Sequence, residues 1–264
     1  MIYINDFSRK FELDLLKLCE NSPYGSSIIS YHEAYHGKKY DFLDFWIQRD
    51  ESGNARCVFC KYYSTLIICG ETHDFAELDE FVGMLDLSNI FCDSSLNLNC
   101  DMELRIGETM MCESVGNMNF EIDGGFVICR VSSDFSQLKK IYDLLLRENS
   151  NKSALSDYES YFLDISHRIR HGVSKVFAVR ASCGEIVSTA AVTAVSKNSS
   201  VIGCVATDSE YRNRGFASAL VGYLTAKELS KKSRVFLHRE REIRIYEKIG
   251  FKTVGYWNEY SSIS

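Results

Sequence analysis

The sequence VIGCVATDSEYRNRGFASALVGYLTA occupies residues 201–226, and in it a strand pattern is followed by a helix pattern. The first part, Val201–Ala206, is apolar, rich in β-branched residues and too short for a helix, so it predicts a buried strand. After a polar turn, apolar side chains recur at the spacing of one helix face, namely at Ala217, Leu220, Val221 and Leu224. The stretch therefore predicts a strand, a turn and an amphipathic helix.

The turn between this strand and helix, Arg212–Ala217, contains two arginines and a glycine. Free backbone amides at the start of a helix, together with the positive end of its dipole, form a site for phosphate. The alternative interpretation is an ordinary strand-to-helix connection with a solvated basic turn. The residues alone leave both interpretations open.

The turn also resembles the coenzyme-A-binding motif of the GNAT superfamily of N-acetyltransferases. That motif has Arg or Gln, two residues, Gly, one residue, and then Gly or Ala. Arg212, Gly215 and Ala217 fill its three fixed positions. The predicted strand before the turn and the helix after it are the context that the family requires. The resemblance implies that the chain binds acetyl-coenzyme A or another acyl-coenzyme A.

In the GNAT fold the motif strand and the next strand, here Arg234–His238, splay apart, and the pantetheine arm of the cofactor lies between them. The resemblance implies that this arm contacts Val205, Ala206 and Thr207. It also implies that the pyrophosphate contacts the turn and the first helical turn, which are Asn213, Arg214, Gly215, Phe216, Ala217 and Ser218. Gly215 would let the backbone approach closely. Arg212 and Arg214 either bind phosphate or are solvated.

A second signature, Ile245-Tyr-Glu-Lys-Ile-Gly-Phe251, is similar to the Tyr-x-x-x-Gly-Phe segment that closes GNAT domains. By this resemblance Tyr246 lies near the thioester sulfur and protonates the departing thiolate as a general acid. The alternative is a packed aromatic side chain on an amphipathic helix. An asparagine that commonly precedes this helix in the family is absent, because the sequence there is His238-Arg-Glu-Arg241.

The general base is left unassigned. Asp208 and Glu210 lie near the end of the motif strand, but acids at such places often act as helix caps or as solvated charges. We expect the acceptor pocket to be formed by the Asn149–Ser156 connection, the end of the preceding hairpin and the first half of the chain.

The composition is that of a globular protein of one or two domains, with 264 residues, 45% hydrophobic and 25% charged. The formal charge of −6 argues against a nucleic-acid-binding protein. The N-terminus has no signal-peptide pattern and no apolar run is long enough for a membrane span, so we expect a cytoplasmic protein. The expected partner is a small-molecule amine or a peptide or protein amine, and the oligomeric state stays open.

Two patterns are compatible with a metal site, and for both we prefer another interpretation. His32, Glu33 and His36 form a His-Glu-x-x-His sequence, as in zinc hydrolases, but a short surface helix with two partly exposed histidines accounts for it. The pair in Cys57–Cys60 lies in a strand-like segment, where residues three apart face opposite sides of a sheet. We expect no metal, and we expect burial for the four cysteines in apolar strand-like runs, Cys69, Cys92, Cys129 and Cys204.

The order of predicted elements extends the GNAT resemblance over residues 126–260. A strand, two helices, a hairpin, the motif strand and helix, and another strand are followed by a helix over Glu240–Ile249 and a final strand pair over Phe251–Tyr260. The first half repeats part of this order, but Gly70–Asp74 stands in place of the motif. We expect a GNAT fold, an α/β fold with a mixed, mostly antiparallel twisted sheet flanked by helices, in residues 121–264. Residues 1–120 are expected to form a smaller α/β domain, either degenerate and GNAT-like or an unrelated accessory.

These observations predict an N-acyltransferase that moves an acetyl or other acyl group from coenzyme A to a primary amine by direct attack. A longer acyl donor stays open, because the layout and the C-terminal segment also look like the glycine N-acyltransferase-like branch. The alternative is a non-catalytic coenzyme-A-binding or interaction module. Such a module needs Arg212, Gly215 and Ala217 but no acid at Tyr246.

Overall fold

The computed structural model describes residues 1–5, 7–35, 40–116, 122, 124–132, 135–148 and 157–263. The first half contains β1 (Ile2–Tyr3), α1 (Arg9–Cys19), α2 (Pro23–Ala34), β2 (Leu43–Arg49), β3 (Ala55–Tyr62), β4 (Thr65–Gly70), α3 (Phe75–Gly83), β5 (Asn89–Asp93) and β6 (Glu103–Cys112). The second half contains β7 (Phe126–Val131), α4 (Leu138–Glu148), α5 (Tyr158–Arg170), β8 (Lys175–Ala181), β9 (Ile186–Val195), β10 (Ser199–Thr207), α6 (Phe216–Leu229), β11 (Arg234–Arg239), α7 (Ile245–Ile249) and β12 (Lys252–Ser261). The two halves share one order of elements, apart from α7, which has no counterpart in the described part of the first half.

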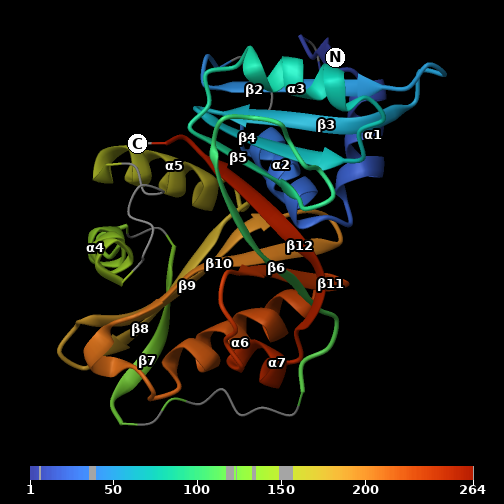
Figure 1. Cartoon of the computed structure of the whole chain (residues 1–264). Coiled ribbons are helices and arrows are strands. Elements are labelled where there is room, and N and C mark those ends of the chain that lie inside the picture. Colours follow the sequence, from blue (N-terminus) through green and yellow to red (C-terminus); the bar gives the residue numbers. More distant parts are fainter. Residues whose placement is uncertain are drawn as a thin grey trace.

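Within the described residues all the strands join one sheet, in the order β1-β2-β3-β4-β5-β12-β6-β11-β10-β9-β8-β7 (Figure 1). Neighbouring strands are antiparallel, except that β4 is parallel to β5 and β10 is parallel to β11. The observed sheet is therefore mixed and mostly antiparallel, which confirms the predicted fold class.

The two halves exchange their last strands. β6, from the first half, lies between β11 and β12, and β12, from the second half, lies between β5 and β6. Each half therefore completes the part of the sheet that belongs to the other. The division into residues 1–120 and 121–264 stays a prediction, and residues 117–121 at that boundary lie outside the described residues.

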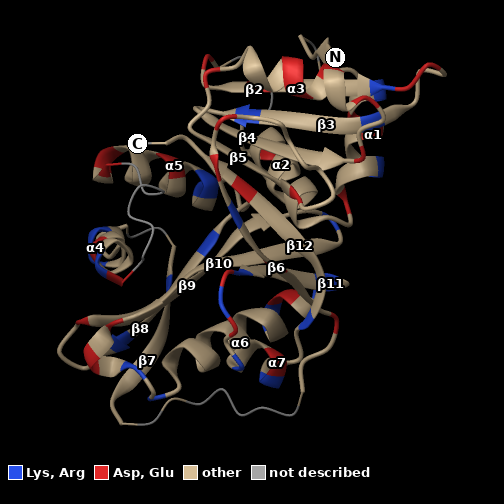
Figure 2. Ribbon diagram, viewed as in Figure 1, with Lys and Arg blue, Asp and Glu red and all other residues tan. Residues whose placement is uncertain are grey.

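Helices cover both faces of the sheet. Tyr260, in the α3 core, and Met110, in the α6 core, point to the same side of the paired strands β12 and β6, so α3 and α6 share a face. The other face packs against α1 and α2 in the first half and against α4 and α5 in the second half. The two helices that share a face differ in charge, because α3 carries several acidic residues whereas α6 has no charged residue before Lys227 (Figure 2).

Two predicted elements near the C-terminus differ from the structure. α7 begins at Ile245 rather than at Glu240. The final pair of strands is a single strand, β12, whose partners are β5 and β6. Both partners come from the first half of the chain, so the local sequence around Phe251–Tyr260 contains no sign of them.

The cysteines follow the prediction only in part. Cys69 and Cys92 are buried, whereas Cys129 is half-buried and Cys204 is exposed. Cys204 differs because it lies at a bulge of β10, outside the regular strand alternation. The two cysteines of Cys57–Cys60 belong to cores on opposite faces of the sheet, as predicted.

The histidine motif of the first half lies on α2 and departs from the prediction. His32 is buried, with its ring against those of Phe7, Phe11 and Phe45, so a partly exposed histidine was the wrong expectation there. His36 lies outside the described residues. Among the residues that the structure does describe, no group of three or more His, Cys, Asp or Glu side chains is placed to hold a metal ion.

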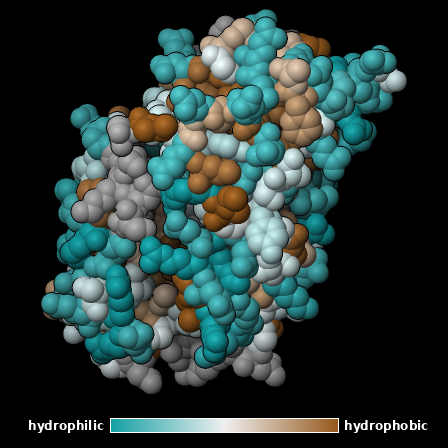
Figure 3. All heavy atoms as spheres, viewed as in Figure 1, coloured by the Kyte–Doolittle hydropathy of each residue, from teal (hydrophilic) through white to brown (hydrophobic). Residues whose placement is uncertain are grey.

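Apolar side chains reach the surface in the middle of the face seen in Figure 3, over β6 and β12. The large exposed residues on these strands include Leu104, Ile106, Val254 and Tyr256. None of the helices in the described ranges is both long enough and apolar enough to cross a membrane.

Candidate functional site

The parallel strands β10 and β11 separate near their C-terminal ends. Their pairing ends at Ile202 and Leu237, although β10 continues to Thr207. On its other side β10 shifts register against β9 between Gly203 and Ala206, and Cys204 has a φ of 51° within that bulge. The bulge and the lost pairing free one edge of β10, which is the geometry that accepts an extended ligand.

The turn after β10 leads into α6 with its backbone amides free. Gly215 is the N-cap residue of α6, its φ is 82°, and no side chain caps the helix. The first turn of α6 contains no acidic residue. A Cβ atom built at Gly215 would meet nothing within 4 Å, so the space in front of the helix is open. Uncapped amides beside open space form a site for an anion.

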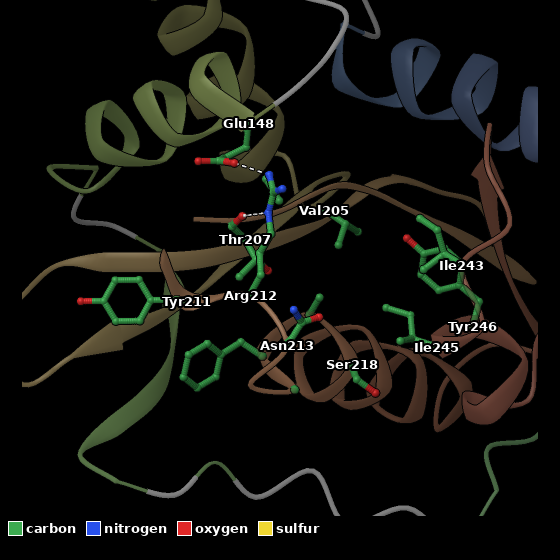
Figure 4. A pocket seen from close by; sticks show the side chains of 14 residues that line it. Glu148, Val205, Thr207, Tyr211, Arg212, Asn213, Ser218, Ile243, Ile245 and Tyr246 are labelled. Carbon is green, nitrogen blue, oxygen red and sulfur yellow. Dashed lines mark hydrogen bonds and ion pairs between the residues drawn. The ribbon is translucent and has the colours of Figure 1, made fainter. Parts of the chain in front are cut away.

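A pocket of about 350 Å³ lies between the end of β10, the start of α6 and α7 (Figure 4). Every predicted cofactor-binding residue except Arg214 lines it, and so does Tyr246. Sequence reasoning missed four further lining residues, Glu148, Tyr211, Ile243 and Ile245. Ile245 belongs to the Tyr246 signature and Ile243 precedes it by two residues, so both could have been inferred from that signature. Nothing in the sequence marks Glu148.

Arg212 and Glu148 lie at one end of this pocket and are joined by an ion pair (Figure 4). Arg212 also donates from Nε to the Thr207 carbonyl at 3.4 Å, and the Ser209 amide donates to Glu148 at 3.3 Å. Glu148 is 6% exposed, whereas Arg212 is 54% exposed. Glu148 therefore ties α4 to the turn and holds the Arg212 guanidinium beside the pocket.

Arg214 does not line the pocket, and its side chain lies against aromatic rings. Its guanidinium carbon lies 4.9 Å from the ring centre of Phe126 and 5.3 Å from that of Phe216. Stacking on aromatic faces is a common environment for arginine. The side chain therefore packs beside the turn. The part of Arg214 that could still contact the pyrophosphate is its backbone amide.

Tyr246 is buried and lies at the other end of the pocket, beside Ile243 and Ile245 (Figure 4). Burial raises the pKa of its hydroxyl, and the nearby Arg239 guanidinium lowers it by a smaller amount. The hydroxyl is therefore protonated at neutral pH, as a general acid requires. The ring also packs at 6.3 Å from Phe251, so Tyr246 both lines the pocket and contributes to the core.

The acids at the end of β10 have structural partners. Asp208 accepts a hydrogen bond from the Glu210 amide at 2.9 Å and forms an ion pair with Arg147. It thereby caps the short 3-10 turn Ser209–Tyr211. This supports the interpretation of Asp208 as a cap, and the general base stays unassigned.

A sequence model of the acetyltransferase (GNAT) domain matches residues 173–253, the region that contains β8 to α7 and most of this pocket. Residues 173–253 are therefore recognisable as a GNAT domain. Comparison with the sequences of curated proteins gives no match.

Solved structures, GNAT proteins among them, share the fold over nearly the whole chain. A tandem GNAT protein from the clavulanic acid biosynthesis pathway is 9% identical with a TM-score of 0.58, and the alignment covers 100% of this chain and 98% of that one. A GCN5-related N-acetyltransferase from Kribbella flavida is 12% identical with a TM-score of 0.60, covering 90% and 96%. A Drosophila protein is 11% identical with a TM-score of 0.68, covering 99% and 97%. At these identities the likeness shows the fold, including a second GNAT-like unit in the first half.

His238 stands in the part of the GNAT domain where an asparagine was expected. It is the first residue of β11 beyond the last pair with β10. Its ring lies on the face opposite α6, 5.6 Å from that of Tyr24 on α2, and its Nδ1 is 3.3 Å from the Thr109 hydroxyl. Burial lowers the pKa of His238 to about 3, so the ring is neutral at neutral pH. Residues 238–241 do not line the pocket. This segment therefore offers no counterpart to the asparagine that commonly precedes the helix in the family.

Proposed function

We propose that the chain is an acyl-coenzyme-A-dependent N-acyltransferase, in the simplest case an acetyltransferase, acting on a primary amine by direct attack. One observation carries the proposal. The uncapped start of α6 and the end of β10, beyond its last pair with β11, meet in a single pocket, with a buried, protonated tyrosine at its far end. That arrangement combines an anion site, a place for an extended arm and a proton donor.

The described residues fit acetyl-coenzyme A. Amides of the turn from Asn213 to Ser218 would hold the pyrophosphate, with the positive end of the α6 dipole behind them. The open space in front of Gly215 supports this, because a Cβ atom there would occupy the approach of the phosphates. Val205, Ala206 and Thr207 would bind the extended arm along the free edge of β10. Arg212, half-exposed beside the pocket, would supply positive charge to the phosphates.

When bound, acetyl-coenzyme A supplies the acyl group as an activated thioester. The roles of the chain's own residues follow from their positions. Tyr246 donates its hydroxyl proton to the leaving sulfur, so that no free thiolate has to form. The C–N bond to the neutral amine would form as the C–S bond breaks, and the proton that the nitrogen loses would return Tyr246 to its protonated form. The separated strands hold the reacting carbonyl in place, which lowers the entropic part of the barrier.

The test is a thiol-release assay with acetyl-coenzyme A and a panel of primary amines. Tyr246→Phe should lower kcat by about 100-fold, because a positioned general acid contributes about 10² or more. Binding of coenzyme A, measured by calorimetry, should be unchanged. Tyr256→Phe is the matched control, since Tyr256 is 53% exposed on β12 and does not line the pocket.

Two outcomes would reject parts of the proposal. Equal turnover by Tyr246→Phe and the wild type would remove Tyr246 as the acid. Tight coenzyme A binding with no turnover of any amine would favour a non-catalytic binding module. The cytoplasmic setting that the sequence analysis expects is part of the same proposal.

A further inference from the structure

Polar side chains from both halves gather beside the bulge of β10, on the face of the sheet opposite α6. Arg168, on α5, donates a hydrogen bond to the carbonyl of Thr193 on β9. A Cβ atom at Gly203 would lie 3.1 Å from the Thr193 methyl group, so Thr193 touches the bulge. Cys204 of the bulge is exposed. The Arg168 guanidinium is therefore hydrogen-bonded to a residue, Thr193, that lies against the bulge of β10.

Asp164 connects this arginine to the first half of the chain. Arg168 donates to one oxygen of Asp164 at 3.3 Å. Tyr62, on β3, donates to the other oxygen at 2.6 Å, and Tyr35, next to α2, donates to the same atom at 3.2 Å. Tyr31, on α2, lies with its ring 4.9 Å from the Arg168 guanidinium carbon and stacks on Tyr62 at 4.2 Å. The carboxylate is thus surrounded by aromatic rings.

This cluster lies beside the bulge and is partly open to solvent. The Asp164 side chain is 26% exposed, and Tyr31 and Tyr62 are half-buried. Although Cys204 is exposed, desolvation by the protein around the cleft has the largest effect on its thiol and raises the pKa. Arg168 lowers this pKa and Asp164 raises it by smaller amounts, so both charges act on the bulge. Asp164 accepts from two tyrosine hydroxyls and from Arg168. A carboxylate beside tyrosine hydroxyls can bind an organic ammonium group through charge-assisted hydrogen bonds.

We propose that this cluster is the acceptor site, in which Asp164 and Tyr62 bind the ammonium group of a small primary amine. The inference rests on the proposed function, because it takes the separated ends of β10 and β11 as the place of acyl transfer. The cofactor then enters from the α6 face and the amine from the α2 and α5 face. The first half of the chain thereby gains a role, since it supplies Tyr62 and the α2 wall of the acceptor site.

The acceptor is a small molecule rather than the side chain of a folded protein, because helices cover this face. α2 packs on β9 and β10, and it is tied there by hydrogen bonds from Ser30 to the Val195 carbonyl at 2.9 Å and between Ser26 and Ser199 at 2.7 Å (Figure 1). α5 covers the neighbouring part of β8 and β9 through Ile165 and Ile169. A protein surface could not approach the bulge without displacing one of these helices.

The first experiment compares steady-state kinetics of variants with ethanolamine, spermidine, phenethylamine, glucosamine and a lysine-containing peptide as acceptors. Asp164→Asn should raise the KM for the best small amine by about tenfold or more, and Tyr62→Phe by about fivefold, as expected for charge-assisted hydrogen bonds. The KM for acetyl-coenzyme A should stay the same. Matched controls are Asp143→Asn, an exposed carboxylate on α4, and Tyr63→Phe, the exposed neighbour of Tyr62.

A second readout needs no turnover. The same small amines should slow the alkylation of Cys204 by iodoacetamide, followed by mass spectrometry, while Cys183, which is also exposed, serves as the internal control. Asp164→Asn should abolish this protection. Unchanged amine KM in both variants, a peptide that is acetylated faster than every small amine, or equal alkylation of Cys204 with and without amine would each overturn the acceptor site. Failure of the wild type to bind coenzyme A by calorimetry would instead reject the proposed function.

Discussion

The first turns of α3 and α6 share a Phe-Ala pair but differ in charge, because that of α3 carries two carboxylates and that of α6 carries no charged side chain. α3 begins Asp74-Phe-Ala-Glu77, and α6 begins Gly215-Phe-Ala-Ser218. In α3 the Asp74 carboxylate caps the helix and accepts a hydrogen bond from the Glu77 amide at 2.9 Å. In α6 no side chain caps the helix. One helix satisfies its free amides with its own carboxylate, and the other leaves them for an anion.

The residues just before the two helices also differ in charge. Three residues before the N-cap stands Glu71 in the first half and Arg212 in the second half. The parallel pair β4 and β5 also ends its pairing early, at Ile67 and Phe91. At Gly70 a Cβ atom would lie 2.2 Å from the Arg56 carbonyl, so the end of β4 is closely packed on its β3 side. The comparison teaches that a few charged residues distinguish the N-terminus of α6, our proposed phosphate site, from the self-capped N-terminus of α3.

The largest expected effect comes from giving α6 the N-terminus of α3. The double variant Gly215→Asp and Ser218→Glu should weaken acetyl-coenzyme A binding by about 100-fold or more, because two carboxylates would occupy and repel the phosphate position. Calorimetry measures the change. Gly215→Asn is the control, since asparagine tolerates a positive φ and carries no charge. Equal weakening by Gly215→Asn would show that backbone strain, not charge, is responsible.

A smaller effect is expected from the charge three residues before the N-cap. Arg212→Gln should weaken acetyl-coenzyme A binding by about tenfold, the size of one charge-assisted hydrogen bond, and Arg212→Glu should weaken it further. The difference should shrink at high salt, because Arg212 is half-exposed. Titrations at low and high ionic strength measure it. If both variants bind like the wild type, Arg212 serves only to hold Glu148.

In the first half the corresponding substitution should change stability and not binding. Asp74→Ala should lower the free energy of unfolding by about 1 kcal/mol, the usual cost of losing an N-cap. Binding of acetyl-coenzyme A should be unaffected. Urea denaturation and calorimetry test the two statements, with Glu80→Ala, an exposed acid in the same helix, as the control. A gain of coenzyme A binding by the first half would contradict the interpretation of this unit as lacking a cofactor site.

The smallest effect concerns the tyrosines where the two halves meet. Burial raises the pKa of Tyr31 from its ordinary 10.0 to about 12. Between pH 10 and pH 12 the hydroxyl of Tyr31 has lost its proton in the unfolded chain but keeps it in the folded chain. The contribution of Tyr31 to the free energy of unfolding is therefore fully present below pH 10 and falls as the pH rises towards 12. Urea denaturation on both sides of the ordinary tyrosine pKa should show this fall, and Tyr31→Phe should reduce it. An identical pH dependence in Tyr31→Phe would assign the fall to other tyrosines.

Most of the candidate site was predictable because it is local in sequence. Arg212, Gly215 and Ala217 lie within six residues, and the positive φ and the uncapped helix follow from that short segment. Glu148 was not predictable, since it reaches the pocket only when α4 packs beside the turn. Arg214 differs from the expectation for the same reason, because its partner Phe126 is on β7.

By itself the sequence determined most of the order of helices and strands, the uncapped helix end that we propose holds phosphate, and the different helix start in the first half. Propensities, caps and glycine conformations depend on neighbours within a few residues, so they can be read along the chain. Only the tertiary structure decided that β6 and β12 change places between the halves, and that Tyr62 and Asp164 meet beside the bulge. Strand partners and contacts between side chains join residues far apart in the chain, and pairing is chosen by the burial of whole faces.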